Sequence, residues 1–177
     1  MLFLELASSI NSSLDIQQVL NNLTVNICDK LGMKGAVIRL LDDERNELKL
    51  VASHGLSEDF LERSRTTTTE TAQRALKGET MVISDTATDS RITFKTAMKT
   101  EGIVSMIVTP ILVREKVIGV LRLYSDVERQ FSDDVIMMVK ALAHQGGLAI
   151  QNASMFLQLE KDKKSLEEDI WSHRSWF

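Results

Sequence analysis

Two arginine residues lie in stretches that are otherwise apolar, and their side chains are the best candidates for binding chemistry in this sequence. Arg39 stands in the segment 37–42 and Arg122 in the segment 117–124, both rich in Val, Ile and Leu. Alternate residues of a β-strand share a face, so each guanidinium would lie on an apolar sheet face, with Tyr124 beside Arg122. Such a group needs an anion, because an unpaired buried charge is costly.

The sequence offers two sources for that anion. A ligand carboxylate or phosphate would accept two parallel hydrogen bonds from a guanidinium. Alternatively, acidic side chains of the chain itself, Asp85, Asp89 or Glu70, would pair with the arginines. We hypothesise that Arg39 and Arg122 bias the site towards anionic ligands, and internal pairing stays open as the alternative.

Catalytic and metal chemistry find little support in the sequence. A single cysteine, Cys28, excludes an internal disulfide and a cysteine-based zinc cluster. The three histidines, His54, His144 and His173, offer no spacing for a metal site. No nucleophile–base pair, phosphate-binding glycine loop or pair of carboxylates has a supporting context. The sequence therefore predicts a non-catalytic domain with no metal site.

The size and charge of the chain limit the classes of partner that it could bind. The 177 residues, of 19.9 kDa, suit one domain with an extension. The chain has 21 Lys and Arg residues and 25 Asp and Glu residues. The net charge of −4 gives no excess of positive charge for binding nucleic acid or an anionic membrane. No apolar run approaches the roughly 18 residues that cross a bilayer, and residues 1–5 lack the basic start of a signal peptide. We therefore predict a cytoplasmic protein without nucleic-acid or membrane partners.

The pattern of apolar residues predicts an α+β domain. Tight polar turns at 43–46 and 114–116 join strand-like segments and make each hairpin antiparallel. Asp15 and Gln18 have the spacing of a capping box at the start of the second helix. The predicted helices are 2–14, 15–31, 57–64, 70–77, 94–101 and a long C-terminal one, and the predicted strands are 35–42, 48–54, 81–83, 103–113 and 117–124.

The C-terminal helix, which Ser132 would cap, carries two apolar stripes. One runs in steps of three and four from Val135 to Ile170, and the other runs beside it from Ile136 but ends at Ala153. Residues 135–153 are therefore expected to cover the domain's own sheet and also to meet a neighbour.

Beyond that point, residues 156–170 can bury their stripe only against another helix. A second copy of the chain is the simplest source of that helix, and folding back onto residues 2–14 is the alternative. The predicted dimer interface comprises Val135, Met138, Leu142, Ala149, Phe156, Leu159 and Leu166.

Several short motifs, in order along residues 13–153, resemble those of the GAF domain family, the small-molecule sensor modules of signalling proteins. They are Ser13-Leu14-Asp15-Ile16, Ile38-Arg39-Leu40-Leu41-Asp42 with Leu48 to Leu56, Val82-Ile83-Ser84-Asp85 with Asp89-Ser90-Arg91, Gly102-Ile103-Val104-Ser105 with Pro110-Ile111, Val117 to Ser125 with Phe131, and Leu142-Ala143 with Ala149-Ile150 and Asn152-Ala153. Two departures are Ser90 in place of the usual proline and Thr69-Glu70-Thr71 where a glycine pair is common.

The resemblance implies a central, mostly antiparallel sheet, with the terminal helices on one face and short helices and loops on the other. A ligand would lie between the sheet and the second layer, where the strands of Arg39 and Arg122 are expected to be neighbours. Asp85 and Arg91 match motif positions and would line the pocket mouth, with a turn cap and an ion pair to Asp89 as the alternative. Cys28-Asp29 does not match the Cys-His of bilin-binding members, so no cofactor is predicted.

Residues and resemblance together predict a three-part chain: an N-terminal helix at 1–14, a GAF-like sensor domain at 15–153 and a coiled-coil-like extension at 154–177. The predicted function is regulatory: an unknown small molecule, of anionic character under the hypothesis above, shifts the geometry of a dimeric helix pair. The resemblance further implies a downstream effector such as a histidine kinase. A ligand-free dimerisation or scaffold module is the alternative.

Overall fold

The computed structural model describes residues 14–64, 67 and 69–174. The predicted helix over residues 2–14 therefore lies almost wholly outside the described residues. The helices are α2 (Leu14–Leu31), α3 (Glu58–Arg63), α4 (Glu70–Leu76), α5 (Lys95–Glu101) and α6 (Asp133–Arg174), and the strands are β1 (Gly35–Asp42), β2 (Glu47–His54), β3 (Met81–Ile83), β4 (Ser105–Val113) and β5 (Lys116–Ser125).

The strands form one five-stranded sheet in the order β2-β1-β5-β4-β3, and every neighbouring pair is antiparallel. The two predicted hairpins, β1–β2 and β4–β5, are confirmed. The central pair, β1 and β5, joins strands that are far apart in the sequence, with Val37 opposite Arg122 and Arg39 opposite Val120.

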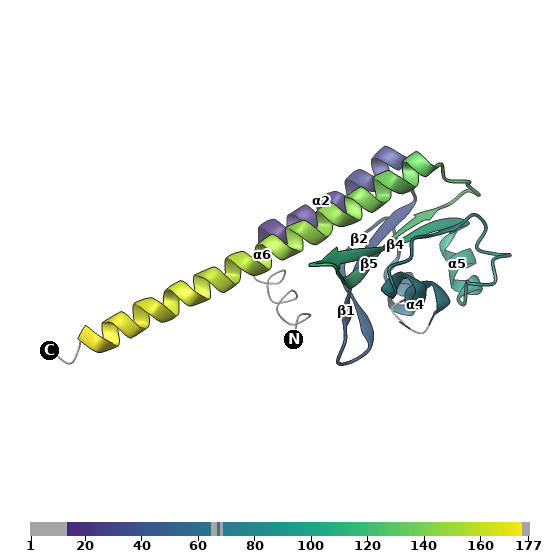
Figure 1. The fold of residues 1–177 in the computed structure, drawn as a ribbon. Helices are drawn as coiled ribbons and strands as arrows, with labels where there is room; N and C mark the ends of the chain where they lie inside the picture. The colour runs from purple at the N-terminus through teal and green to yellow at the C-terminus, as the bar shows by residue number, and fades with distance from the viewer. Residues whose placement is uncertain (1–13, 65–66, 68, 175–177) are drawn as a thin grey trace.

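Each face of the sheet carries its own helical layer (Figure 1). Helices α2 and α6 lie side by side on one face, and α4 and α5 lie on the other. Alternation along the strands divides the core accordingly, so that Ile38 and Leu121 pack beneath α2 and α6, while Val37 and Val120 face the short helices. The predicted α+β fold is confirmed.

Helix α6 approaches the sheet closely because a glycine stands at the contact. A Cβ atom built on Gly147 would lie 2.4 Å from the backbone oxygen of Leu112 on β4, a distance that real Cβ atoms do not reach. Val139, Ala143 and Ile150 of the same helix are buried against the core. The second predicted stripe is therefore the one that covers the sheet.

The ends of the two long helices follow local signals in the sequence. Helix α2 stops where Gly32 adopts a left-handed backbone at φ 60°, and Ser132 Oγ accepts a hydrogen bond of 3.4 Å from the Val135 amide at the start of α6. The predicted capping box is wrong in position, because Asp15 lies in the first turn of α2 and does not precede it.

The second half of α6 leaves the domain (Figure 1). The helix has 42 residues, or about 63 Å at the usual rise, and every described residue from Gln158 onward is exposed. Within the described part of the chain, none of the helices combines the length and apolar character that crossing a bilayer requires.

Candidate functional site

Arg39 and Arg122 lie on the sheet face that the short helices cover. They occupy diagonal positions on the neighbouring strands β1 and β5, on the same side as Val37, Val120 and Tyr124. Diagonal Cβ atoms on adjacent strands are about 7–8 Å apart, within the reach of two long side chains. The structure therefore brings three of the predicted site residues together.

The C-terminal end of α3 supplies acceptors for both guanidinium groups. Arg39 Nη2 donates to the Leu61 carbonyl and, at 3.4 Å, to Ser64 Oγ, and its Nη1 donates to the Leu48 carbonyl at 3.3 Å. Arg122 Nη1 donates to the Ser64 carbonyl at 3.2 Å. The Leu61 and Ser64 carbonyls carry the partial negative charge of a helix C-terminus, so the arginines cap α3 from beneath, whereas the Leu48 carbonyl belongs to β2.

Burial makes this a demanding environment for two cations. Arg39 is 3% exposed and Arg122 is 5% exposed. Arg122 Nε is buried without a hydrogen-bond acceptor. Among the described residues Asp42 is the sole buried carboxylate, and it binds the Arg45 amide in the β1–β2 turn. Arg122 therefore retains one buried donor that no acceptor satisfies.

The acidic residues considered as internal partners are engaged elsewhere. Asp89 forms an ion pair with Arg91 at 2.6 Å, and Glu70 forms one with Arg74 at 3.5 Å. Asp85 caps its own turn. Pairing of Arg39 and Arg122 with these three carboxylates is therefore wrong.

A small cavity adjoins Arg122. Its volume is about 20 Å³, room for about one ordered water molecule. Hydroxyl groups and apolar side chains line it: Ser64, Thr69, Thr71, Ile92, Thr93, Phe94, Met98, Met106 and Tyr124. In this conformation this cavity, bounded by described residues, is too small to hold a ligand.

Two contacts anchor α3 over this cavity. Phe60 is buried and its ring meets Tyr124 edge to face, with centroids 5.4 Å apart and planes at 89°. At the N-terminal end of the helix, the amide and hydroxyl of Ser57 donate to the Glu101 carboxylate at 2.7 and 2.6 Å. Helix α3 is thus held at its start and middle by contacts that do not involve the arginines.

The other two predicted ligand residues lie apart from the arginines. Asp85 accepts hydrogen bonds from the Ala87 amide and the Thr88 hydroxyl, both at 2.9 Å. Arg91 donates to Asp89 and, at 3.0 Å, to the Val82 carbonyl. The Arg91 guanidinium lowers the pKa of the Asp89 carboxyl by hydrogen bonding to it.

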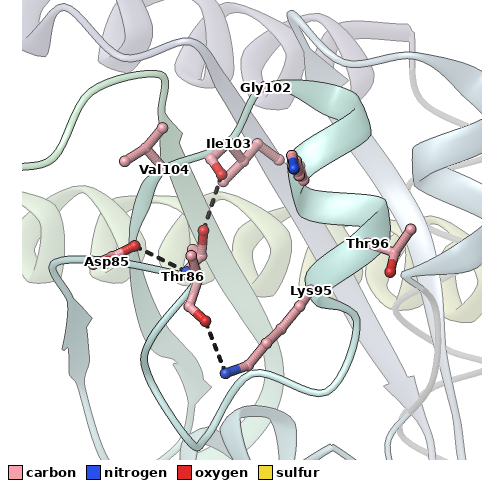
Figure 2. A pocket seen from close by; sticks show the side chains of 9 residues that line it. Asp85, Thr86, Lys95, Thr96, Gly102, Ile103 and Val104 are labelled. Carbon is pink, nitrogen blue, oxygen red and sulfur yellow. Dashed lines mark hydrogen bonds between the residues drawn. The ribbon is translucent and has the colours of Figure 1, made fainter.

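Asp85 instead borders a groove on the outer side of the β3–α5 loop (Figure 2). The groove has a volume of about 560 Å³. Thr86 donates to the Ile103 carbonyl at 2.9 Å, and Lys95 reaches back to the Ala87 carbonyl at 2.9 Å. These bonds tie the loop to α5 and leave no buried polar group aimed into the groove.

Three residues of the site were not predicted to line a ligand pocket: Ser64, Thr69 and Thr71. Ser64 is the C-cap of α3, and Thr69 caps α4 by accepting from the Ala72 amide at 3.2 Å. A run of hydroxyl residues before a predicted helix was the available signal, and it pointed to a cap but not to a cavity.

The predicted dimer residues divide along α6. Near the body, Val135, Leu142 and Ala149 are partly buried against the domain's own core, whereas Met138 is 46% exposed. Farther out the predicted residues are largely exposed: Phe156 61%, Leu159 67% and Leu166 63%. Among residues 14–64, 67 and 69–174, no apolar surface covers these outer side chains.

The chain forms an antiparallel five-stranded sheet between a pair of long helices and a layer of short ones. Its sequence matches a family model. That model describes the GAF domain and aligns with residues 13–151. This chain belongs to the GAF domain family. No curated protein sequence matches the chain significantly.

Solved structures share the fold of this GAF domain at low sequence identity. A domain of a protein described as a two-component sensor histidine kinase, from Sinorhizobium meliloti 1021, is 22% identical with a TM-score of 0.67, over 80% of this chain and 92% of that one. The GAF domain of a phosphoenolpyruvate-protein phosphotransferase from Coxiella burnetii is 17% identical with a TM-score of 0.70, over 85% and 91%.

An enzyme also shares the fold. The free methionine-R-sulfoxide reductase of Neisseria meningitidis is 21% identical with a TM-score of 0.67, over 86% of this chain and 87% of that one. Here the one cysteine, Cys28, is buried on α2, on the sheet face opposite the arginines. Burial and the neighbouring Asp29 raise the pKa of its thiol to about 11, so the reactive thiolate is scarce at neutral pH.

Proposed function

We propose that this GAF domain is a regulatory module that senses a small molecule and reports it through a helix pair formed by α6 of two copies. One observation carries the proposal: α6 runs without a break from its contact with the sheet into a segment with an exposed apolar seam. Phe156, Leu159, Leu166 and Ile170, which define this outer seam, are between 57% and 67% exposed.

The spacing of the outer seam favours a coiled coil. Its members follow at intervals of three, seven and four residues, with Lys163 at the intermediate position. Burying a Leu, Ile or Phe side chain is worth about 1.5–3 kcal/mol, and a partner helix would bury these side chains in both copies. A helix segment that makes no contact with its own domain gains most of its stability in this way.

The sheet offers a path from the arginine site to α6. Met106 of β4 lines the small cavity, while Leu112 of the same strand lies beneath Gly147 of α6. Arg122 stands on β5, which pairs with β4 along its whole length. A ligand that favours one position of these strands would shift the population of α6 arrangements by its differential affinity.

Within this proposal the chain divides as the sequence predicts, into the helix at 1–14, a sensor part at 15–153 and an extension at 154–177. The extension would pass the change to an effector domain of the same or another protein. The setting we propose is the cytoplasm, without nucleic acid or membrane as a partner.

Sedimentation equilibrium of the purified chain tests the dimer. We expect a dimer for the native sequence and a monomer for the double variant Leu159→Glu, Leu166→Glu, which places carboxylates in the outer seam. Lys161→Glu is the matched control, because it changes the net charge by the same amount from a position on the opposite side of the helix, and it should remain dimeric. A native chain that stays monomeric at high concentration would overturn the proposal.

A second function has an observation of its own. The cavity of about 20 Å³ would suit a module that binds no ligand and serves dimerisation alone. Native mass spectrometry of protein purified from its source separates the two, because it reports the subunit number and any retained small molecule together. A ligand-free dimer would favour the scaffold, and a dimer with retained ligand would favour the sensor.

A further inference from the structure

The number of cations beneath α3 exceeds what a helix end requires. Arg129 shows the ordinary case: its guanidinium donates to the Leu31 and Gly32 carbonyls at 2.8 and 2.9 Å and caps the 18-residue helix α2. Helix α3 has six residues, yet two buried guanidinium groups meet at its end. A short helix carries little dipole charge, so its C-terminal carbonyl is a weak partner for the buried guanidinium of Arg122.

The hydrogen-bond donor that lacks an acceptor belongs to a residue that lines the cavity. Arg122 lines it, is 5% exposed and holds its Nε buried without an acceptor. A carbonyl presents one acceptor atom with partial charge, whereas a carboxylate or phosphate presents two or more oxygen atoms with full charge to a guanidinium fork. An oxyanion is therefore a better partner for Arg122 than the single carbonyl that it binds here.

We propose that the site binds a small organic anion, whose oxyanion head replaces the C-terminal carbonyls of α3 as the partner of Arg39 and Arg122. The apolar body of the ligand would take the space among Ile92, Met98 and Met106. The inference rests on the sensor function proposed above and names its ligand class. Helix α3 acts as an internal competitor that fills the site when the ligand is absent.

Competition follows from the geometry. The cavity holds about one water molecule, so a ligand fits only when the end of α3 withdraws. The bonds from Ser57 to Glu101 hold the far end of the helix and do not depend on the arginines. Anything that weakens the docking of α3 should consequently strengthen anion binding, because less free energy is spent on its release.

Binding of benzoate, phenyl phosphate and benzamide to the full chain, measured by calorimetry, tests the ligand class. Benzamide has the shape of benzoate without its charge and should bind at least about ten-fold more weakly. Binding of benzoate but not phenyl phosphate assigns a carboxylate head, and the reverse assigns a phosphate head. Equal binding of benzoate and benzamide, or no binding of any probe, overturns the proposal.

Two variants test the role of Arg122 and of α3 in opposite directions. Arg122→Met should weaken binding of the anion by at least about ten-fold. Ser57→Ala removes the N-cap hydroxyl of α3 together with the bond from that hydroxyl to Glu101, and it should tighten binding about five-fold. Unchanged or weaker binding in Ser57→Ala contradicts competition, and this test stands even if Arg122→Met fails to fold.

Hydrogen exchange supplies a readout that a purely structural role would not move. The bound anion should speed exchange of the Leu61 and Ser64 amides, which bond within α3, while sheet amides are unaffected. None of these measurements depends on the association state. A dimer that binds no anion thus refutes the ligand class alone, and a monomer that binds one refutes only the helix-pair scheme.

Discussion

Arginine side chains in this domain serve different purposes according to their partners. Arg91 is bound on several sides, by both oxygens of Asp89 and by the Val82 carbonyl. Arg122 has a single carbonyl acceptor among the described residues and a buried Nε without one. A guanidinium bonded by both oxygens of a carboxylate and by a carbonyl fixes a loop, and one with a single acceptor is available for exchange of partners.

The Asp89–Arg91 pair predicts a pH-dependent contribution to stability. The pKa of Asp89 lies below its usual 3.8 because Arg91 binds the carboxylate. A carboxyl whose pKa is depressed on folding stabilises the protein above its unfolded pKa, and this contribution is lost as the pH falls through the folded pKa. Replacing Arg91 with Met should thus lower the free energy of unfolding by about 1–2 kcal/mol at pH 7 and by less near pH 3.

Urea denaturation across this pH range measures the effect. A residual difference at low pH is expected, because the bond from Arg91 to the Val82 carbonyl does not titrate. Arg63→Met serves as the control, since Arg63 pairs with Asp59 at an exposed position, where the loss should be about 0.3–0.5 kcal/mol. A loss in Arg91→Met that is constant from pH 7 to pH 3 would contradict the assigned cause.

At the scale of elements, the fold depends on how closely α6 can approach β4. The glycine pair Gly146 and Gly147 falls in the buried stripe, where glycine costs helix stability of about 1 kcal/mol per residue relative to alanine. The contact with Leu112 explains why position 147 carries this cost, since a Cβ there would meet a backbone atom that cannot move aside.

Gly147→Ala therefore tests the packing of α6. Despite the better helix propensity of alanine, we expect the variant to be less stable by about 1–3 kcal/mol, because the helix must shift off the sheet. Gly146→Ala is the comparison, since its Cβ would meet only the flexible end of Leu23 at 3.2 Å. Thermal unfolding of both variants decides the point, and equal stability of the two would show that α6 adjusts freely.

The local sequence pattern was enough to predict most helices and strands, but it was not enough to predict the contacts in the site. The hairpins and α6 follow from alternation, turn residues and caps, which act over a few positions. The partner of Arg122 depends on where α3 docks, and that is fixed by Phe60 packing on Tyr124, 64 positions away in the sequence. Sequence pattern placed the arginines on a shared face, but the internal partners that it offered as an alternative were wrong, because the backbone carbonyls of a short helix leave no trace in composition.

At the scale of the whole molecule, a rigid helix of about 63 Å joins the domain to a distant apolar seam. Lys163 stands within the outer seam between Leu159 and Leu166. In a parallel, in-register pair Lys163 would face its own copy, and both ammonium groups could extend into water. A shift by one heptad would place it against Phe156 or Ile170, so a single lysine favours one register.

Disulfide trapping tests that arrangement. In a Cys28→Ser background, Leu159→Cys should form an intermolecular disulfide under mild oxidation, because residues at a seam position face their own copies. A disulfide requires Cα atoms about 4.4–6.8 Å apart. Lys161→Cys, on the opposite side of the same turn, should cross-link at least about ten-fold more slowly, since its copies point apart. Equal rates at the two positions would indicate random collision. No cross-link at residue 159 in a chain that sediments as a dimer would indicate an antiparallel or shifted pair, in which the two sensor parts could not act on the same end of the seam.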